Sequence, residues 1–290
     1  MKKVLSFDIG GTKIAYSIID ENGQFVCDVM KVSTPDTAEG IRDFFKKTIK
    51  DYYADINGVA FSTAGAVNHE GTRITSFTGN LPQGYNETDF VKLTDKPVLV
   101  ENDANSAAWA EYKLGAAQGC CDAVVLAIGT GVGSGIIVNG KLLKGKSGAA
   151  GEMHFPIDSG HKRVCRGCGQ PDCFESFASG TGLAMSAQAV MGENATTYDV
   201  IAGKNKGDSL AIQVFNEWQN YLTKGMIMLG NVFDPEKIVL SGSLAQFVEY
   251  EKVEKTINEA ILTQPLQVCP AKFENNAGML GAGLLLLEKL

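Results

Sequence analysis

Two glycine-rich turns, one of them beside a carboxylate, are the first residues of this chain that could do chemistry. Asp8 stands just before Gly10 and Gly11, and a second turn at 129–135 alternates glycine with other residues. A turn without side chains lets backbone N–H groups point at an anion, and glycine accepts the positive φ angles involved without steric cost. Two such turns could hold a polyphosphate from both sides, although each could equally be a tight hairpin. Because Asp8 would repel phosphate without a cation between them, the first turn predicts Mg²⁺ held through water molecules.

The turns match neither of the common phosphate-binding motifs. Neither turn is directly followed by Gly-Lys-Ser or Gly-Lys-Thr, so neither is itself a Walker A loop, and Gly10-Gly11-Thr12 does not give the Gly-x-Gly-x-x-Gly of a Rossmann site. An apolar run suited to a hairpin strand follows each turn, where a Rossmann unit would have a helix. The turns therefore predict a different α/β nucleotide site.

A second carboxylate, Asp103, lies between an apolar run at 97–101 and a helical pattern at 104–114. Ligand-facing groups of α/β folds lie at the carboxyl ends of strands, which favours a site role. Taken alone, Asp103 would be explained at least as well as a helix N-cap. Its neighbour Asn102 offers both a donor and an acceptor for hydroxyl groups.

One histidine and three cysteines gather between residues 154 and 173. His154, Cys165, Cys168 and Cys173 together could close a tetrahedral structural Zn²⁺ site. The alternative is a group of free thiols on a loop. In a cytoplasmic chain such a cluster points to metal or thiol chemistry more than to a disulfide framework.

The apolar pattern predicts an α/β fold whose opening occurs twice. Runs at 4–7 and 14–19 surround the first turn and lead through Asn22-Gly23 into a run at 24–30, while runs at 124–128 and 136–138 surround the second turn and lead to Asn139-Gly140. Asn-Gly between apolar runs is typical of a hairpin. We therefore expect two related halves that face each other. Further strands are expected at 58–62, 97–101, 237–240 and 266–273, and helices at 38–53, 104–114, 175–190, 208–232, 244–262 and 277–289.

Composition limits the class of protein. The 290 residues carry 26 Lys+Arg against 33 Asp+Glu, a formal net charge of −7, which argues against nucleic acid as a partner. The longest apolar run, 279–287, is far shorter than the roughly 20 residues that span a bilayer. Asp8 interrupts the N-terminal apolar run too early for the apolar core of a signal peptide. We expect a cytoplasmic protein that does not associate with membranes.

Five ordered motifs resemble the ROK family (repressors, open reading frames, sugar kinases) of the actin/hexokinase-like superfamily. They are the segments 8–13, 100–105, 129–135, 234–242 and 277–282, which together extend over essentially the whole chain. The resemblance implies two facing RNase H-like domains with a cleft between them. Residues 1–117, joined by a C-terminal helix at 277–290, would form the small domain, and 118–276 the large one with a zinc loop at 152–173.

The resemblance also implies roles for residues. Asp103 would be the general base toward a sugar hydroxyl. The sugar would contact Gly65, Asn80, Asn102, Glu152, His154 and Glu175, and ATP with Mg²⁺ would contact Asp8, Gly10, Gly11, Thr12, Lys13, Thr130, Gly131, Val132, Gly133 and Gly242. Zinc would brace the sugar-binding residues. The family has Glu-x-x-His and Cys-x-Cys where this chain has Glu152-x-His154 and Cys165-x-x-Cys168, so His161 is an alternative ligand.

Within the family, length and motif layout are most similar to the bacterial N-acetylmannosamine kinases of amino-sugar (sialic acid) catabolism. The resemblance thus implies ATP-dependent phosphorylation of the 6-hydroxyl of N-acetylmannosamine by a homodimer. The alternatives are a glucokinase or an N-acetylglucosamine kinase of the same family. A sugar-responsive regulator is the non-enzyme alternative, but the first motif begins within eight residues of the start, so we expect no DNA-binding domain ahead of it.

Overall fold

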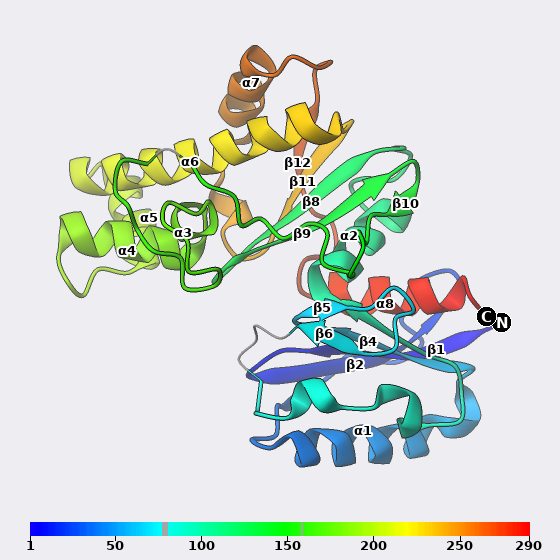
Figure 1. Ribbon diagram of the computed structural model, residues 1–290. Helices are drawn as coiled ribbons and strands as arrows, with labels where there is room; N and C mark the ends of the chain where they lie inside the picture. Colours follow the sequence, from blue (N-terminus) through cyan, green and yellow to red (C-terminus); the bar gives the residue numbers. More distant parts are fainter. Residues whose placement is uncertain (77–80, 158) are drawn as a thin grey trace.

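Two five-stranded sheets with the same strand order form the two halves of the molecule (Figure 1). The computed structural model describes residues 1–76, 81–157 and 159–290. The duplication expected from the two turns is confirmed, because the glycine turns join equivalent strands, β1 to β2 and β8 to β9. The first sheet has the order β3 (Met30–Ser33), β2 (Lys13–Asp20), β1 (Lys3–Ile9), β4 (Gly58–Thr63) and β7 (Val98–Asn102). The second has the order β10 (Lys141–Leu142), β9 (Val132–Val138), β8 (Ala123–Ile128), β11 (Lys237–Ser241) and β12 (Gln267–Pro270).

Strand direction places the chemistry of each half at one edge. In the first sheet β1, β4 and β7 are parallel, with Asp8 in register with Ser62 and Thr63 in register with Asn102. In the second sheet β8, β11 and β12 are parallel as well. The carboxyl ends of parallel strands meet at the same edge, so each sheet presents one row of strand ends toward the cleft.

Two helices lie between the sheets (Figure 1). Helix α8 (Ala277–Leu287) packs on β1 and β4, whereas α2 (Asp103–Leu114) packs on β8 and β9 of the other half. The two helices pack closely against each other, since a Cβ on Gly281 would lie 1.6 Å from the Ser106 carbonyl oxygen. Only glycine allows this approach, which brings the start of α2 close to both sheets.

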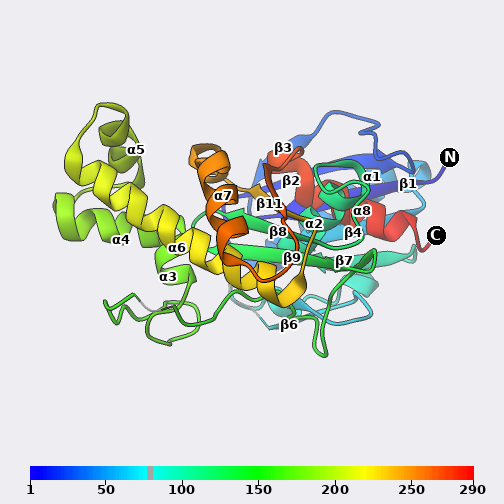
Figure 2. The ribbon, with the colours of Figure 1, turned by 90° about the horizontal axis from the view of Figure 1, so that it is seen from above.

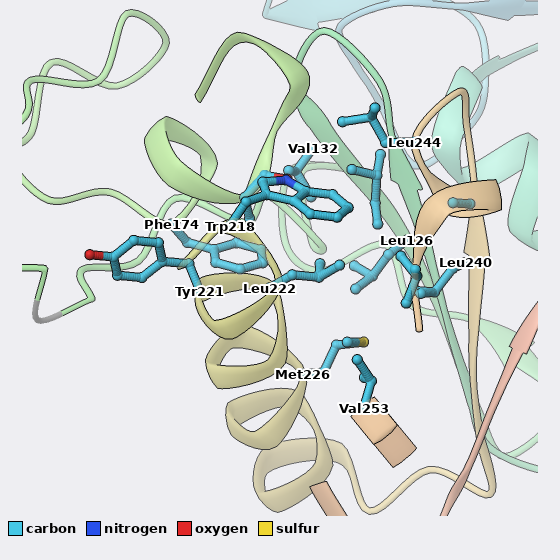
Figure 3. Packing of buried hydrophobic residues seen from close by; sticks show 14 of the residues in the cluster. Leu126, Val132, Phe174, Trp218, Tyr221, Leu222, Met226, Leu240, Leu244 and Val253 are labelled. Atoms are coloured by element: carbon cyan, nitrogen blue, oxygen red, sulfur yellow. The ribbon is translucent and has the colours of Figure 1, made fainter. Parts of the chain in front are cut away.

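The remaining helices cover the outer faces. In the first half α1 (Ala38–Tyr52) buries Ile41, Phe45 and Ile49 at helical spacing. In the second half α6 (Ser209–Phe233) and α7 (Tyr250–Ala260) pack together, and α4 (Gly180–Met191) and α5 (Thr197–Asn205) lie beside α6 (Figure 2). Trp218 and Phe174 lie at the centre of the second core (Figure 3). The short elements are η1 (Tyr53–Asp55), β5 (Ala66–Val67), β6 (Ile74–Ser76), η2 (Tyr85–Glu87), η3 (Phe90–Leu93), α3 (Glu175–Ala178), η4 (Ala245–Phe247) and η5 (Glu274–Asn276).

Four predicted elements differ from the structure. The run 24–30 contributes only a bridge between Ile19 and Phe25, and pairing with β2 resumes at β3. The helix expected at 175–190 is interrupted at Ser179, whose extended backbone lets its hydroxyl cap α4. The helix expected at 244–262 is only η4 and α7, and the strand expected at 266–273 is confined to β12. Helix α5 was not predicted, although Thr196 and Asp199 form its capping box.

Within the described residues, no helix combines the length and the apolar character that a bilayer crossing requires.

Candidate functional site

A cleft of about 560 Å³ lies between the two rows of strand ends. Its lining includes backbone from both glycine turns and side chains from both halves. Twelve of the predicted site residues line it: Asp8, Gly10, Gly65, Asn102, Asp103, Gly131, Val132, Gly133, Glu152, His154, Glu175 and Gly242. Gly11, Thr12, Lys13 and Thr130 belong to the turns at its edge, and Asn80 lies outside the described residues.

Asp8 lies near the carboxyl end of β1, half-buried in the cleft wall. Its Oδ1 accepts a hydrogen bond of 2.8 Å from the Ser62 hydroxyl of the neighbouring strand. Burial raises the pKa of Asp8, while the Ser62 bond and the positive charge of Lys13 lower it to a smaller extent. Among the described residues only Oδ1 of this carboxylate has a hydrogen-bond partner, so its other oxygen could hold a hydrated cation.

Asp103 is the first residue of α2, and its side chain is open to the solvent in the cleft. Although solvent reaches it in the cleft, protein surrounds the carboxylate closely and partly desolvates it; this desolvation, followed by the negative charge of Asp8, raises the pKa of Asp103 to about 6. The N-cap of α2 is Asn102, whose Oδ1 accepts from the Asn105 backbone N–H at 3.0 Å. Asp103 is therefore not the N-cap, although its Oδ1 accepts from the Ala104 backbone N–H at 2.9 Å. Its carboxylate lines the cleft, where a ligand could reach it.

Asn102 also connects the strand end to the loop after β4. Its Nδ2 donates to the carbonyl of Gly65 at 3.1 Å. Gly65 has a φ of 96°, so it occupies a backbone conformation that glycine favours. The two residues form one side of the cleft with their backbone and amide groups.

The first glycine turn is a tight hairpin with exposed backbone. The Gly10 N–H donates to the Lys13 carbonyl at 3.0 Å, and the Thr34 hydroxyl donates to the Gly10 carbonyl at 2.6 Å. Gly11 and Thr12 are exposed between these bonds. The turn is thus both a hairpin and a surface of exposed backbone at the cleft edge, and these two interpretations do not exclude each other.

The second glycine turn is held by the start of α4 and by Glu175. The Gly180 N–H donates to the Gly129 carbonyl at 2.8 Å, and the Thr181 hydroxyl donates to the Thr130 carbonyl at 2.8 Å. Glu175 Oε2 accepts from the Val132 N–H at 3.0 Å, and a Cβ on Gly131 would lie 2.6 Å from that oxygen. These contacts fix the turn before any ligand binds.

Gly242 follows β11 with a φ of 88° and lines the cleft from the second half. A Cβ on it would lie 2.5 Å from the Ile128 carbonyl oxygen, so glycine is required here for packing whatever the ligand.

The His/Cys cluster, formed by His154, Cys165, Cys168 and Cys173, comes together beside the cleft. Its potential ligand atoms all lie within 4.8 Å of one another, and His154 Nδ1 is 3.5 Å from Cys173 Sγ and 3.9 Å from Cys165 Sγ. A tetrahedral zinc ion with bonds of about 2.3 Å to sulfur and about 2.05 Å to nitrogen separates such atoms by about 3.6 Å. The residues present therefore fit zinc.

The other ring nitrogen of His154 faces the cleft, with Nε2 3.6 Å from Glu152 Oε2. Burial raises the pKa of the Cys165 thiol, but hydrogen bonds from the Cys168 backbone and the Ser176 side chain outweigh it and lower that pKa to about 7. His161, the alternative ligand, lies elsewhere and pairs with Glu217 at 3.1 Å. The structure thus brings together the ligand set with His154 and Cys165.

Two contributors to the site escaped sequence reasoning. Ser62 holds Asp8, which only the register of β1 and β4 reveals. Gly278 allows α8 to begin against Asp8, because a Cβ there would lie 2.7 Å from Asp8 Oδ1. The run of small residues at 278–283 was visible in the sequence, but not its partner.

Comparisons with known proteins agree with the resemblance of the motifs. The sequence matches the ROK family over residues 4–289. It is 34% identical to the N-acetylmannosamine kinase of Escherichia coli O157:H7, with 97% of each chain covered. Among solved structures, the ROK family glucokinase of Streptomyces griseus in complex with glucose and AMPPNP is 30% identical, with a TM-score of 0.75 and 98% of each chain covered. The ROK hexokinase of Thermus thermophilus is 28% identical, with a TM-score of 0.82; the match covers 99% of this chain and 100% of that chain. The α/β chain with its two matching sheets therefore belongs to the ROK family.

Proposed function

We propose that this protein is an ATP-dependent sugar kinase that phosphorylates the 6-hydroxyl of N-acetylmannosamine, with Asp103 as general base. The relatives described above are kinases of hexoses or of N-acetylmannosamine, which supports sugar phosphorylation. The observation that carries the proposal is the position of the Asp103 carboxylate, at the start of α2 in the cleft that both glycine turns line.

In the proposed reaction Asp103 accepts the proton of the sugar hydroxyl as that oxygen attacks the γ-phosphate of ATP. A pKa of about 6 leaves Asp103 ionised at neutral pH and makes it a stronger base than an ordinary aspartate. Asn102 and Gly65 would orient the sugar from one side, and Glu152, His154 and Glu175 from the other. Asn80 is proposed as a further sugar contact on the strength of the family motif alone.

Backbone groups would bind the phosphates. We assign the triphosphate to Gly10, Gly11, Thr12 and Lys13 of the first turn and to Thr130, Gly131, Val132 and Gly133 of the second, with Gly242 near the adenosine. Asp8 would hold Mg²⁺, which when bound neutralises the charge that develops on the phosphates. Ser62 keeps one oxygen of Asp8 occupied and so orients the other.

The His/Cys cluster would hold a structural zinc ion through His154 Nδ1 and the three thiolates. Zinc in this place supplies no chemistry to phosphoryl transfer. It would fix the ring of His154 and the loop that precedes Glu175, and so keep the sugar side of the cleft in shape.

The choice of N-acetylmannosamine depends on the 34% identity with the E. coli enzyme. Glucose is the second candidate, because the glucokinase of S. griseus is similar over nearly the whole chain; N-acetylglucosamine is the third. We further propose that residues 1–117 with 277–290 form one domain and 118–276 the other, and that the enzyme is a cytoplasmic homodimer.

A coupled assay of ADP release tests the proposal. The purified protein is given ATP, Mg²⁺ and one sugar at a time: N-acetylmannosamine, N-acetylglucosamine, glucose or fructose. We expect the highest kcat/KM with N-acetylmannosamine. A higher value with glucose would move the assignment to a glucokinase, and turnover of none of the sugars would leave the regulator alternative in place.

A further inference from the structure

The most buried ion pair among the described residues joins the two halves of the molecule. Lys144 Nζ, from the loop after β10, lies 2.7 Å from Glu101 Oε2 of β7, with the side chains 15% and 2% exposed. Taking two charges out of water is costly, and removing one partner leaves the other buried and unpaired. A pair so largely shielded from water calls for an explanation that general stability does not supply.

The second oxygen of Glu101 holds the junction that presents Asp103. Glu101 Oε1 accepts from the Asn102 backbone N–H at 3.0 Å and from Asn105 Nδ2 at 3.2 Å. These two residues lie on either side of Asp103, and their own hydrogen bond caps α2. The direction of the Glu101 carboxylate therefore fixes the strand-to-helix turn from which Asp103 projects.

The loop that carries Lys144 rests on the first half and then forms part of the cleft. The carbonyl of Gly145 is hydrogen-bonded to His69 Nε2, and a Cβ on Gly148 would lie 1.6 Å from the Val67 carbonyl oxygen. In Figure 2 the loop that follows β9 and β10 reaches the side of β6. Residues 148–152 line the cleft, so the same loop leads directly to Glu152.

We propose that Lys144 is a positioning residue for phosphoryl transfer: its ion pair with Glu101 fixes the turn that presents Asp103 and joins it to the loop on the sugar side of the cleft. This role rests on the proposed function of Asp103. Without the ammonium group, the buried Glu101 carboxylate must take up a proton or turn toward water. Either change disturbs its bonds to Asn102 and Asn105 and displaces the base. Lys289 is a further charged group near the pair: burial and the positive charge of Lys144 lower its pKa, and the negative charge of Glu101 opposes them to a smaller extent.

Replacement of Lys144 by methionine tests the inference, since it removes the charge and keeps the apolar stem. We expect Lys144→Met to lower kcat by about tenfold or more, because misplacement of a catalytic group by about 1 Å can cost 10²-fold, while the KM for ATP changes less than about twofold. Lys144→Arg keeps the charge and should restore most of kcat. Lys146→Met is the matched control in the same loop, because Lys146 is exposed, and it should behave as the wild type.

A merely structural role would give a different result. Lys144→Met would then lower the unfolding temperature but leave the kcat of the folded enzyme within about twofold, and this outcome would overturn the inference. The double variant Glu101→Gln with Lys144→Met replaces the ion pair by two neutral side chains, so it leaves no buried charge unpaired. It can therefore be measured even if a single variant fails to fold. Its loss of kcat should be close to that of either single variant. A loss equal to the product of the two single losses would mean that the residues act independently and would also overturn the inference.

The proposed function is judged separately, from the wild type and from Asp103→Asn. If the wild type is active and loses kcat in Asp103→Asn but not in Lys144→Met, only the inference on Lys144 fails. If the wild type phosphorylates none of the sugars, the proposed function fails and the inference fails with it.

Discussion

Replacement of Asp103 by asparagine should inactivate the enzyme and at the same time stabilise its fold at neutral pH. Folding raises the pKa of Asp103 from 3.8 to about 6. The native state therefore binds this proton more tightly than the unfolded state, and stability falls as pH rises from 3.8 to 6 and stays reduced above that. At about 1.36 kcal/mol for each pH unit the full penalty is about 3 kcal/mol. Because the side chain is open to solvent in the cleft, screening reduces this to about 1 kcal/mol.

Two measurements on Asp103→Asn follow from these magnitudes. Loss of a general base typically lowers kcat by 10²–10⁴-fold, whereas sugar binding measured by calorimetry should be largely retained. The unfolding temperature at pH 7.5 should rise by about 2 °C, and the gain should shrink to about a third by pH 4.5, where the wild type is mostly protonated. Asp43→Asn is the control, since Asp43 is exposed on α1.

The two measurements have separate refutations. A kcat above about a tenth of the wild-type value would show that Asp103 is not the base. An unfolding temperature that falls at pH 7.5, or a gain that does not change with pH, would show that burial and Asp8 do not raise its pKa. Inactivity together with higher stability would exclude misfolding as the reason for the lost activity.

Three further predictions concern pH, metal and packing. Because Asp103 must be ionised to act as base, kcat/KM for the sugar should fall about tenfold per pH unit below a midpoint of about 6, and a profile flat down to pH 5 would contradict the assignment. Protein purified without chelator should contain about one zinc per chain, and its removal should raise the KM for the sugar; less than about 0.3 zinc per chain would count against a structural site. Gly281→Ala should lower the free energy of unfolding in urea by about 3 kcal/mol, because the new Cβ would lie 1.6 Å from the Ser106 carbonyl oxygen. Gly283→Ala should lower it by less, because its Cβ would lie 2.8 Å from the movable end of the Ile19 side chain. Equal effects would contradict this account of the packing of α2 and α8.

The duplicated architecture was readable from sequence because its signals are local. Apolar runs around glycine turns, each followed by Asn-Gly, predicted the strands β1, β2, β8 and β9 of the two sheets. In two of the places where the prediction was wrong, a polar side chain holds the local backbone. Ser179 divides a continuous helical pattern because its hydroxyl satisfies the Gly182 N–H and starts a new helix. Asp20 accepts from the Asn22 and Gln24 N–H groups and holds the turn after β2.

The candidate site was predictable to the extent that its residues lie in one motif. Asp8 and Asp103 each stand in a short segment with a recognisable pattern, and the family resemblance supplied the rest. The contacts that position them come from elsewhere in the chain. Ser62 reaches Asp8 through strand register, and Lys144 reaches Glu101 from the opposite half. Such pairings depend on the tertiary fold, and a single sequence without aligned relatives does not reveal them.

Glu175 joins three parts of the site that the sequence presents separately. Its Oε2 accepts from the Val132 N–H in the second glycine turn, and its Oε1 lies 3.8 Å from Cys165 Sγ in the His/Cys cluster. The same side chain lines the cleft on the side assigned to the sugar. A carboxylate has only two oxygens, so the bond to Val132 and the contact with Cys165 together determine how the group is turned. A shift of the cluster would therefore alter the contact between Glu175 and the second glycine turn. In the proposed enzyme a structural metal would thus support nucleotide binding as well as sugar binding.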